Sequence, residues 1–124
     1  MALHNEFGAW GEDVAADYLV GKGYAIVDRN VRFGRNELDI VAMHAGRIVF
    51  VEVKTRRDDS FDPTVGITRA KMLHLSRAAN SYVRAYDIPH EVQFDVILIT
   101  GTPETGAHVD HYPDAFFPPL TGYY

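Results

Sequence analysis

The stretch that decides the fold is residues 36–57, NELDIVAMHAGRIVFVEVKTRR. Two apolar patterns, residues 38–43 and 47–55, stand on either side of the connection His44-Ala45-Gly46, and this arrangement predicts an antiparallel hairpin. Ile, Val and Phe dominate both patterns, as expected for side chains that pack on a pleated surface. We therefore expect a β-sheet to form around this hairpin.

Three charged residues interrupt this apolar stretch: Asp39, Glu52 and Lys54. Charged side chains are seldom buried unless they are paired or bind a metal, because removing an isolated ion from water is costly. Glu52 and Lys54 are two positions apart and point to the same face of a strand. If the hairpin pairs His44 with Arg47, its register also places Asp39 opposite Glu52. Two carboxylates and an ammonium would then converge on one edge of the hairpin, which is typical of a divalent-metal site.

Mg²⁺ and similar cations prefer oxygen ligands, commonly one or two carboxylates completed by water and phosphate. Asp39 and Glu52 would supply the carboxylates, and the backbone carbonyl of Val53 would add a further ligand. Lys54 would hold or deprotonate an attacking water, and the cation would stabilise charge on a phosphate. The alternative that the spacing leaves open is a pair of structural ion pairs, in which Asp39 or Glu52 binds Lys54 or an arginine.

Helix and strand patterns surround the hairpin. Apolar residues at helical spacing predict a first helix over residues 5–20, ended by Gly21 and Gly23, with Glu12 at the border of its apolar stripe. From there Glu12 would reach the carboxylate cluster directly or through water. The remaining patterns predict a strand over residues 24–32, a helix over 68–86 with Thr68 as its N-cap, a buried strand over 92–100 and a short edge strand near 108–112.

The predicted order is α-β-β-β-α-β, which indicates an α/β fold with a central mixed β-sheet flanked by helices. The antiparallel hairpin would lie in the middle of this sheet, and the second helix would cross over to the strand over residues 92–100. At 124 residues and 47% hydrophobic composition, the chain is expected to form a single domain over 1–124, with a turn-rich tail from about residue 101.

Neither a signal peptide nor a run of about 18 apolar residues is present, so we expect a cytoplasmic protein without a membrane segment. The chain has no cysteine, and this composition suits a reducing compartment.

Charge is distributed unevenly along the chain. The net charge is −5, yet all twelve Lys and Arg residues lie between Lys22 and Arg84, where the net charge is +5. Residues 1–21 carry −4 and residues 85–124 carry −6. The basic middle segment could therefore contact phosphates although the whole protein is acidic; a solvated surface of mixed charge is the alternative.

Asp39 followed by Glu52-Val53-Lys54 resembles the PD-(D/E)XK signature of the restriction-endonuclease-like superfamily. As an ordered set over about residues 5–117, the chain resembles the YraN-type family of uncharacterised bacterial proteins, which is itself similar to archaeal Holliday junction resolvases. The motifs that carry this resemblance are Gly11-Glu12, Gly23-Tyr24, Arg29-Asn30-x-Arg32, Glu37-Leu38-Asp39, residues 49–54 with Arg56, Lys71, and Phe94-Asp95-Val96.

The resemblance implies a restriction-endonuclease-like fold and a Mg²⁺- or Mn²⁺-dependent DNA endonuclease that acts on branched or structured DNA. The implied catalytic residues are Glu12, Asp39, Glu52 and Lys54, and the implied metal ligands are Asp39, Glu52, Val53 and Glu12. Phosphate contacts are expected from Arg29, Arg32, Arg56 and Arg57, with a surface role as the alternative. Lys71 is expected to contact either DNA or the residues that hold the metal. Junction resolvases make two cuts with two sites, so the analogy predicts a homodimer.

Two other functions remain open: a non-catalytic or weakly catalytic binding module that retains the nuclease fold, and an interaction protein that uses the aromatic tail over residues 116–124. Asp95 interrupts a buried strand and is expected to have a structural role, as a cap or as the partner of an arginine. His108 and His111 would point to opposite faces of an edge strand, which argues against zinc.

Overall fold

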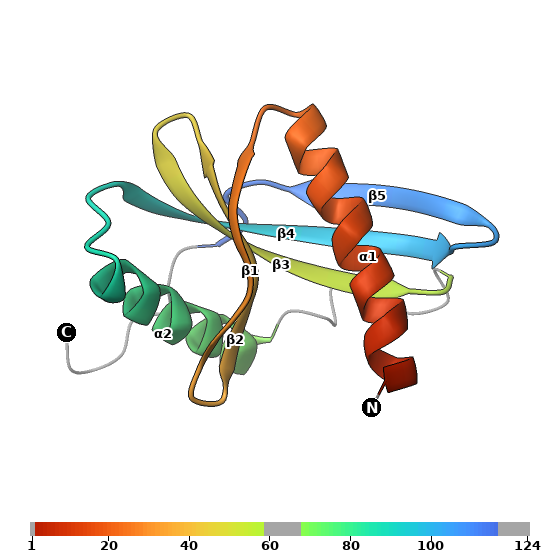
Figure 1. Cartoon of the computed structure of the whole chain (residues 1–124), viewed down its shortest axis with the longest axis horizontal. Helices are drawn as coiled ribbons and strands as arrows, with labels where there is room; N and C mark the ends of the chain where they lie inside the picture. Colours follow the sequence, from red (N-terminus) through yellow and green to blue (C-terminus); the bar gives the residue numbers. More distant parts are fainter. Residues whose placement is uncertain (1, 59–67, 117–124) are drawn as a thin grey trace.

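The computed structural model describes residues 2–58 and 68–116. The order of elements is helix, three strands, helix and two strands, as the sequence patterns predict, with the last strand at the position of the expected edge strand (Figure 1). The elements are α1 (Ala2–Gly21), β1 (Ala25–Phe33), β2 (Asn36–His44), β3 (Arg47–Arg56), α2 (Arg69–Ala85), β4 (Glu91–Thr102) and β5 (Gly106–Tyr112).

The strands form one open five-stranded sheet in the order β1-β2-β3-β4-β5. Strands β3 and β4 are parallel, and every other neighbouring pair is antiparallel. A parallel pair needs a crossover connection, which α2 supplies. This open mixed sheet flanked by helices confirms the predicted α/β class and is consistent with a restriction-endonuclease-like fold.

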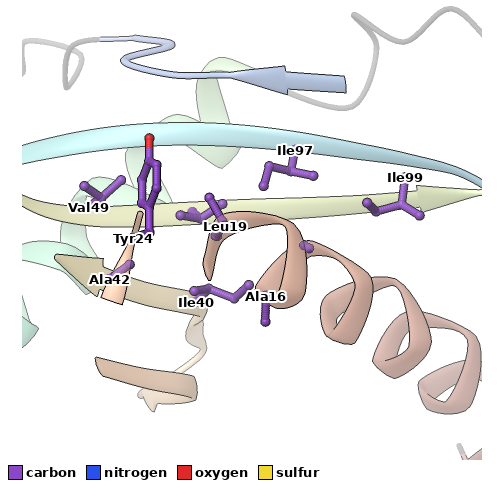
Figure 2. Packing of buried hydrophobic residues seen from close by; sticks show 10 residues of the cluster. Ala16, Leu19, Tyr24, Ile40, Ala42, Val49, Ile97 and Ile99 are labelled. Atoms are coloured by element: carbon purple, nitrogen blue, oxygen red, sulfur yellow. The ribbon is translucent and has the colours of Figure 1, made fainter. Parts of the chain in front are cut away.

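Helix α1 packs against one face of the sheet. Its Ala15 and Leu19 are fully buried against side chains from the three central strands and β1. Figure 2 shows Leu19 and Ala16 of α1 beside Ile40 of β2 and Ile97 of β4. Burying one such aliphatic side chain contributes about 1.5–3 kcal/mol, so α1 is a firm support for the residues that it carries.

Helix α2 forms a second core with Leu75, Ala78, Ala79 and Tyr82, which pack against Phe50 and other residues of the sheet. Thr68 is the N-cap, as predicted, and its hydroxyl oxygen accepts a hydrogen bond from the backbone N–H of Lys71 at 3.1 Å. This bond fixes the first turn of α2, and thereby the position of Lys71.

The ring of Phe116 stacks on that of Phe94 with 4.8 Å between centroids. The rest of the predicted aromatic tail, residues 117–124, and most of the loop after Arg57, residues 59–67, lie outside the described residues.

The central hairpin has the predicted turn and register. Ala45 and Gly46 both have positive φ, 52° and 78°, as the tight turns that join twisted antiparallel strands require. His44 pairs with Arg47, and the ladder continues to Ile40 opposite Val51.

The predicted pairing of Asp39 with Glu52 does not follow as a further rung, because the backbone ladder of β2 and β3 ends at Ile40 and Val51. Beyond this point the β1–β2 hairpin turns away from β3 (Figure 1). Asn30 of β1, which would face Asp39 on the other side, has a φ of 55°. Asp39 therefore lies where the central sheet opens.

Asp95 is 1% exposed and lies on the α1 side of β4. It accepts hydrogen bonds from Tyr24 Oη at 2.8 Å, Gln93 Nε2 at 2.8 Å and the backbone N–H of Asp114 at 3.0 Å, and His111 Nε2 is 2.8 Å from its carboxylate. Figure 2 shows Tyr24 pointing toward β4. The structural role is confirmed, but the predicted arginine partner is wrong, because Tyr24 and His111 occupy the positions around this carboxylate.

His108 lies 3.2 Å from Asp110, whereas His111 binds Asp95, so the two histidines do not share a ligand. Over residues 2–58 and 68–116, neither helix is long and apolar enough to cross a membrane.

Candidate functional site

Asp39 occupies the point at which β2 separates from β3. Its Oδ2 accepts a hydrogen bond from the backbone N–H of Val53 at 2.9 Å, so the side chain replaces the missing rung of the ladder. The N–H and C=O of one strand residue point to the same neighbour, and the Val53 carbonyl therefore faces the same gap. Burial raises the pKa of the Asp39 carboxyl, and the hydrogen bond from Val53 opposes that rise.

Glu52 precedes Val53 on β3 and is only 6% exposed. Its Oε2 lies 3.3 Å from the Nζ of Lys71, whereas its Oε1 is buried and, while both carboxyls are ionised, has no hydrogen-bond donor among the described residues; a protonated Glu52 would share its proton with Asp39. Burial, followed by the negative charge of Asp39, raises the pKa of Glu52 to about 8, although the Lys71 ammonium acts in the opposite direction. The site therefore places the carboxyl groups of Asp39 and Glu52 close together. The Lys71 ammonium, which α2 carries, lies against Glu52.

An unpartnered buried oxygen is unusual in a native protein and calls for an explanation. In Glu52 the oxygen is a carboxylate oxygen beside a second carboxyl, and the Val53 carbonyl faces the same opening. Carboxylate and carbonyl oxygens are the ligands that Mg²⁺ and Mn²⁺ prefer. The residues present at this point thus fit a divalent cation.

Two lysines lie near Glu52, and only one was predicted to pair with it. Lys54 is on the same face of β3, as predicted, but it is exposed and makes no ion pair or hydrogen bond with a described residue. Lys71, which was expected to contact either DNA or the residues that hold the metal, forms the ion pair instead. The only sequence signal for this role is its place in the first turn of α2, three residues after Thr68.

Glu12 lies on the other side of Asp39, on α1. Its pKa is raised to about 7, first by burial and then by the charge of Asp39, and Arg29 opposes this rise. The guanidinium of Arg29 is 3.8 Å from Glu12 Oε1. Gly11 holds this part of α1 tightly against β3, because a Cβ at this position would overlap the Thr55 hydroxyl. Glu12 is therefore fixed near Asp39.

The three carboxylates do not form a single ligand group. Within the described ranges, no three His, Asp or Glu side chains are arranged to hold one metal ion. Asp39 and Glu52 are brought together, the Val53 carbonyl faces the same gap as Asp39, and Glu12 is linked to Asp39 through charge.

The arginines expected to contact phosphate all have partners within the chain. These contacts are mostly near the surface, where ion pairs contribute little and can be exchanged for phosphate. The partners are Asp13 for Arg29 at 2.8 Å, Glu37 for Arg32 at 3.7 Å, Thr100 Oγ1 for Arg56 at 2.9 Å and the ring of Phe7 for Arg57 at 4.7 Å.

A pocket of about 530 Å³ opens next to Glu12; we call it the Glu12 pocket. No sequence pattern predicts this pocket, because its walls come from α1, β1, β2 and β3. It is lined by Phe7, Gly8, Ala9, Glu12, Asn30, Arg32, Glu37 and Thr55.

The model of a protein family described as "Uncharacterised protein family UPF0102" matches residues 11–99. The chain belongs to this family. The match spans Glu12, Asp39, Glu52, Lys54 and Lys71, and it confirms the YraN-type resemblance.

Relatives named "UPF0102 protein" are similar over nearly their whole length. The chain is 41% identical to one from Phocaeicola vulgatus over 97% of the chain and 99% of the relative. It is 43% identical to one from Bacteroides fragilis over the same shares, and 43% identical to one from Syntrophotalea carbinolica over 88% of the chain and 89% of the relative.

Proposed function

We propose that this protein is a metal-dependent endonuclease that hydrolyses phosphodiester bonds in branched or otherwise structured DNA. The observation that carries the proposal is the buried pair of carboxyls, Asp39 and Glu52, with the Oε1 of Glu52 left without a partner. A scaffold protein has no need for this arrangement, since burying charge without full compensation costs stability. Strongly perturbed carboxyls of this kind concentrate at functional sites.

Asp39, Glu52 and the carbonyl of Val53 would hold Mg²⁺ or Mn²⁺, and Glu12 would contribute through a water molecule. When bound, the cation would neutralise the negative charge that builds on the phosphate during cleavage. Lys71 keeps the Glu52 carboxylate in place through its 3.3 Å contact. Lys54, exposed on the same face of β3, would donate hydrogen bonds to the phosphate.

The reaction would be an in-line attack of water on the phosphorus, with cleavage of the bond to the 3′ oxygen and release of a 5′-phosphate, as the PD-(D/E)XK resemblance implies. The twelve Lys and Arg residues all lie in the segment that contains Asp39 and Glu52, which supports binding of a polyanion despite a net charge of −5.

Cleavage of synthetic four-way junctions and flaps tests the proposal. Wild type is expected to cut at least one of these substrates with Mg²⁺ or Mn²⁺ and to stop when a chelator is added, and Asp39→Ala is expected to lose the activity. Asp17→Ala, the same change at an exposed aspartate of α1 outside the site, is the control and should cut like wild type. Equal activity of wild type and Asp39→Ala, or no cleavage by either over a broad panel, would refute catalysis at this site.

A binding module with the same fold is the second candidate, because Glu12 does not join Asp39 and Glu52 in one ligand group and the arginines are engaged within the chain. Calorimetry separates the two functions. The endonuclease is expected to bind Mn²⁺ and to lose this binding in Glu52→Gln. No heat of Mn²⁺ binding in either protein would favour the module.

A further inference from the structure

The chemistry of the Glu12 pocket does not suit a phosphate. Two carboxylates, those of Glu12 and Glu37, line it and would repel an anion. Asn30 and Arg32 add hydrogen-bond donors, which lie against Glu12 and Glu37 in the free protein and would exchange these contacts for a ligand. Thr55 adds a hydroxyl, and Phe7, Gly8 and Ala9 form a wall without charge. A ligand that fits this lining is uncharged and carries both hydrogen-bond donors and acceptors.

We propose that the Glu12 pocket receives the base of an unpaired nucleotide next to the cleaved phosphate. The inference rests on the proposed nuclease function and specifies its substrate: DNA with an unpaired nucleotide beside the cleavage point, such as a flap. Nucleobases present exocyclic amino groups, ring nitrogens and carbonyls on one edge, which match the carboxylates, the amide and the guanidinium of the pocket.

The pocket is large enough for this ligand. Its volume of about 530 Å³ is within the range of about 300–1,000 Å³ typical of pockets for small molecules. A base in a duplex cannot enter it, because it is stacked and paired, and extraction costs a few kcal/mol. An unpaired base escapes most of that cost, and this difference would select flaps over continuous duplex.

The pocket also lies close enough to the carboxyl pair for one nucleotide to reach both. Glu37 is two residues from Asp39 along β2, a rise of about 7 Å. Thr55 is likewise two residues from Val53 along β3, and Asn30 stands on β1 between the partners of Ile40 and Leu38, the residues on either side of Asp39. At the rim, the guanidinium of Arg57 lies over the ring of Phe7, and the side chain of Arg32 is 67% exposed, so both can reach flanking phosphates.

The carboxylates of the pocket also predict which bases bind best. Adenine, cytosine and guanine carry an exocyclic amino group that can donate to Glu12 or Glu37, whereas thymine donates only through its ring N3–H, which two carbonyl oxygens flank. An unpaired cytosine is therefore expected to bind more tightly than an unpaired thymine in the same flap.

Gly8→Leu blocks the pocket without disturbing the fold. A Cβ added at Gly8 meets nothing within 4 Å, and the residue lines the pocket. Leucine is also a better helix former than glycine, so α1 should not be weakened. Gly21→Leu is the matched control, since a Cβ at this other glycine of α1 also meets nothing within 4 Å and the residue is not part of the pocket.

The assay is binding of fluorescent DNA in the Glu52→Gln background, which prevents cleavage. The probes are a duplex, the same duplex with a single-stranded flap, and the flap with an abasic nucleotide at its first unpaired position. We expect the flap to bind about tenfold more tightly than the duplex or the abasic flap, a step within the range for one well-paired base edge. Gly8→Leu should abolish this difference, and Gly21→Leu should keep it.

The inference is overturned if Gly8→Leu prefers the flap as strongly as Gly21→Leu, or if neither protein distinguishes flap from duplex. The proposed function can fail independently of the pocket. If the protein that retains Glu52 binds a flap through the pocket but never cuts it with Mg²⁺ or Mn²⁺, the nuclease is refuted and the pocket is supported. Cleavage that is the same in Gly8→Leu and Gly21→Leu supports the nuclease and refutes the pocket.

Discussion

Replacement of Glu52 by glutamine is expected to stabilise the protein at alkaline pH. Burial and the neighbouring Asp39 raise the pKa of Glu52 from 4.5 to about 8 in the folded chain. Between these two values the unfolded chain releases a proton that the folded chain retains, so the free energy of unfolding falls as pH rises. Below pH 4.5 both states hold the proton, and the penalty disappears.

The size of the effect follows from the shift. Each pKa unit corresponds to about 1.4 kcal/mol, so a rise from 4.5 to about 8 lowers the free energy of unfolding by about 5 kcal/mol between pH 4 and pH 9. Asp39 titrates with Glu52 and shares the penalty, so we expect a gain of at least about 2 kcal/mol for Glu52→Gln at pH 9. The neutral amide keeps an oxygen that accepts a hydrogen bond from Lys71, whose ammonium is 3.3 Å from Oε2 in the wild type.

Urea unfolding of wild type and Glu52→Gln at pH 5, 7 and 9 measures this difference. The two curves should nearly coincide at pH 5, and the variant should unfold at higher urea at pH 9. Mn²⁺ should stabilise the wild type at pH 8 and leave the variant unchanged, because a ligand stabilises only the state that binds it. The claim that Glu52 carries a destabilising buried charge would be refuted by either of two results: a variant less stable than wild type at pH 9, or one whose stability falls with pH as steeply as that of the wild type.

Further predictions concern Lys71, Gly11, Asp95 and the cap of α2. Lys71→Met should destabilise the protein by about 1–3 kcal/mol at pH 8. This is less than the loss for a fully buried pair, because the lysine is partly exposed. Equal urea midpoints for Lys71→Met and wild type would show that the ion pair between Lys71 and Glu52 contributes nothing. Gly11→Ala should lower the melting temperature, since its Cβ would overlap Thr55, whereas Gly8→Ala should raise it slightly; the opposite order would contradict the packing of α1. Asp95→Asn should cost about 2–4 kcal/mol in urea unfolding because an amide cannot accept from all the donors around it, and a change below about 0.5 kcal/mol would contradict its buried network. Thr68→Ala should cost about 1 kcal/mol by the same assay, and no loss would mean that the N-cap does not hold the first turn of α2.

Much of the fold could be predicted because its signals are local. The apolar patterns of residues 38–43 and 47–55 and the short turn between them determine the hairpin. The pairing of His44 with Arg47 follows from the length of that turn. The N-cap at Thr68 likewise depends on residues of a single turn. Each of these features is decided within a few residues, so one sequence is enough to predict it.

The candidate site was predictable only in part. Asp39 and Glu52 come together as expected, but the ladder ends one residue before them. The divergence coincides with the positive φ of Asn30 on the neighbouring strand, so it involves three strands and no single strand pattern encodes it. Asp39 consequently binds the backbone of Val53 instead of extending the ladder.

The partner of Glu52 could not be predicted from spacing along β3. Lys54 shares its face, yet Lys71 arrives from α2 because the crossover places the first turn of that helix beside the carboxylate. Contacts between residues far apart in sequence depend on how elements pack. The same reason applies to the Glu12 pocket, whose lining comes from four elements.

The most direct test of the central claim is a crystal structure of the protein soaked in Mn²⁺, with the metal located by its anomalous scattering. We predict an anomalous peak between the carboxylates of Asp39 and Glu52, within ligand distance of the Glu52 Oε1 that has no partner among the described residues. The same peak should be missing in crystals of Glu52→Gln. Well-diffracting wild-type crystals with no peak at this position would contradict the claim that these residues form a metal centre.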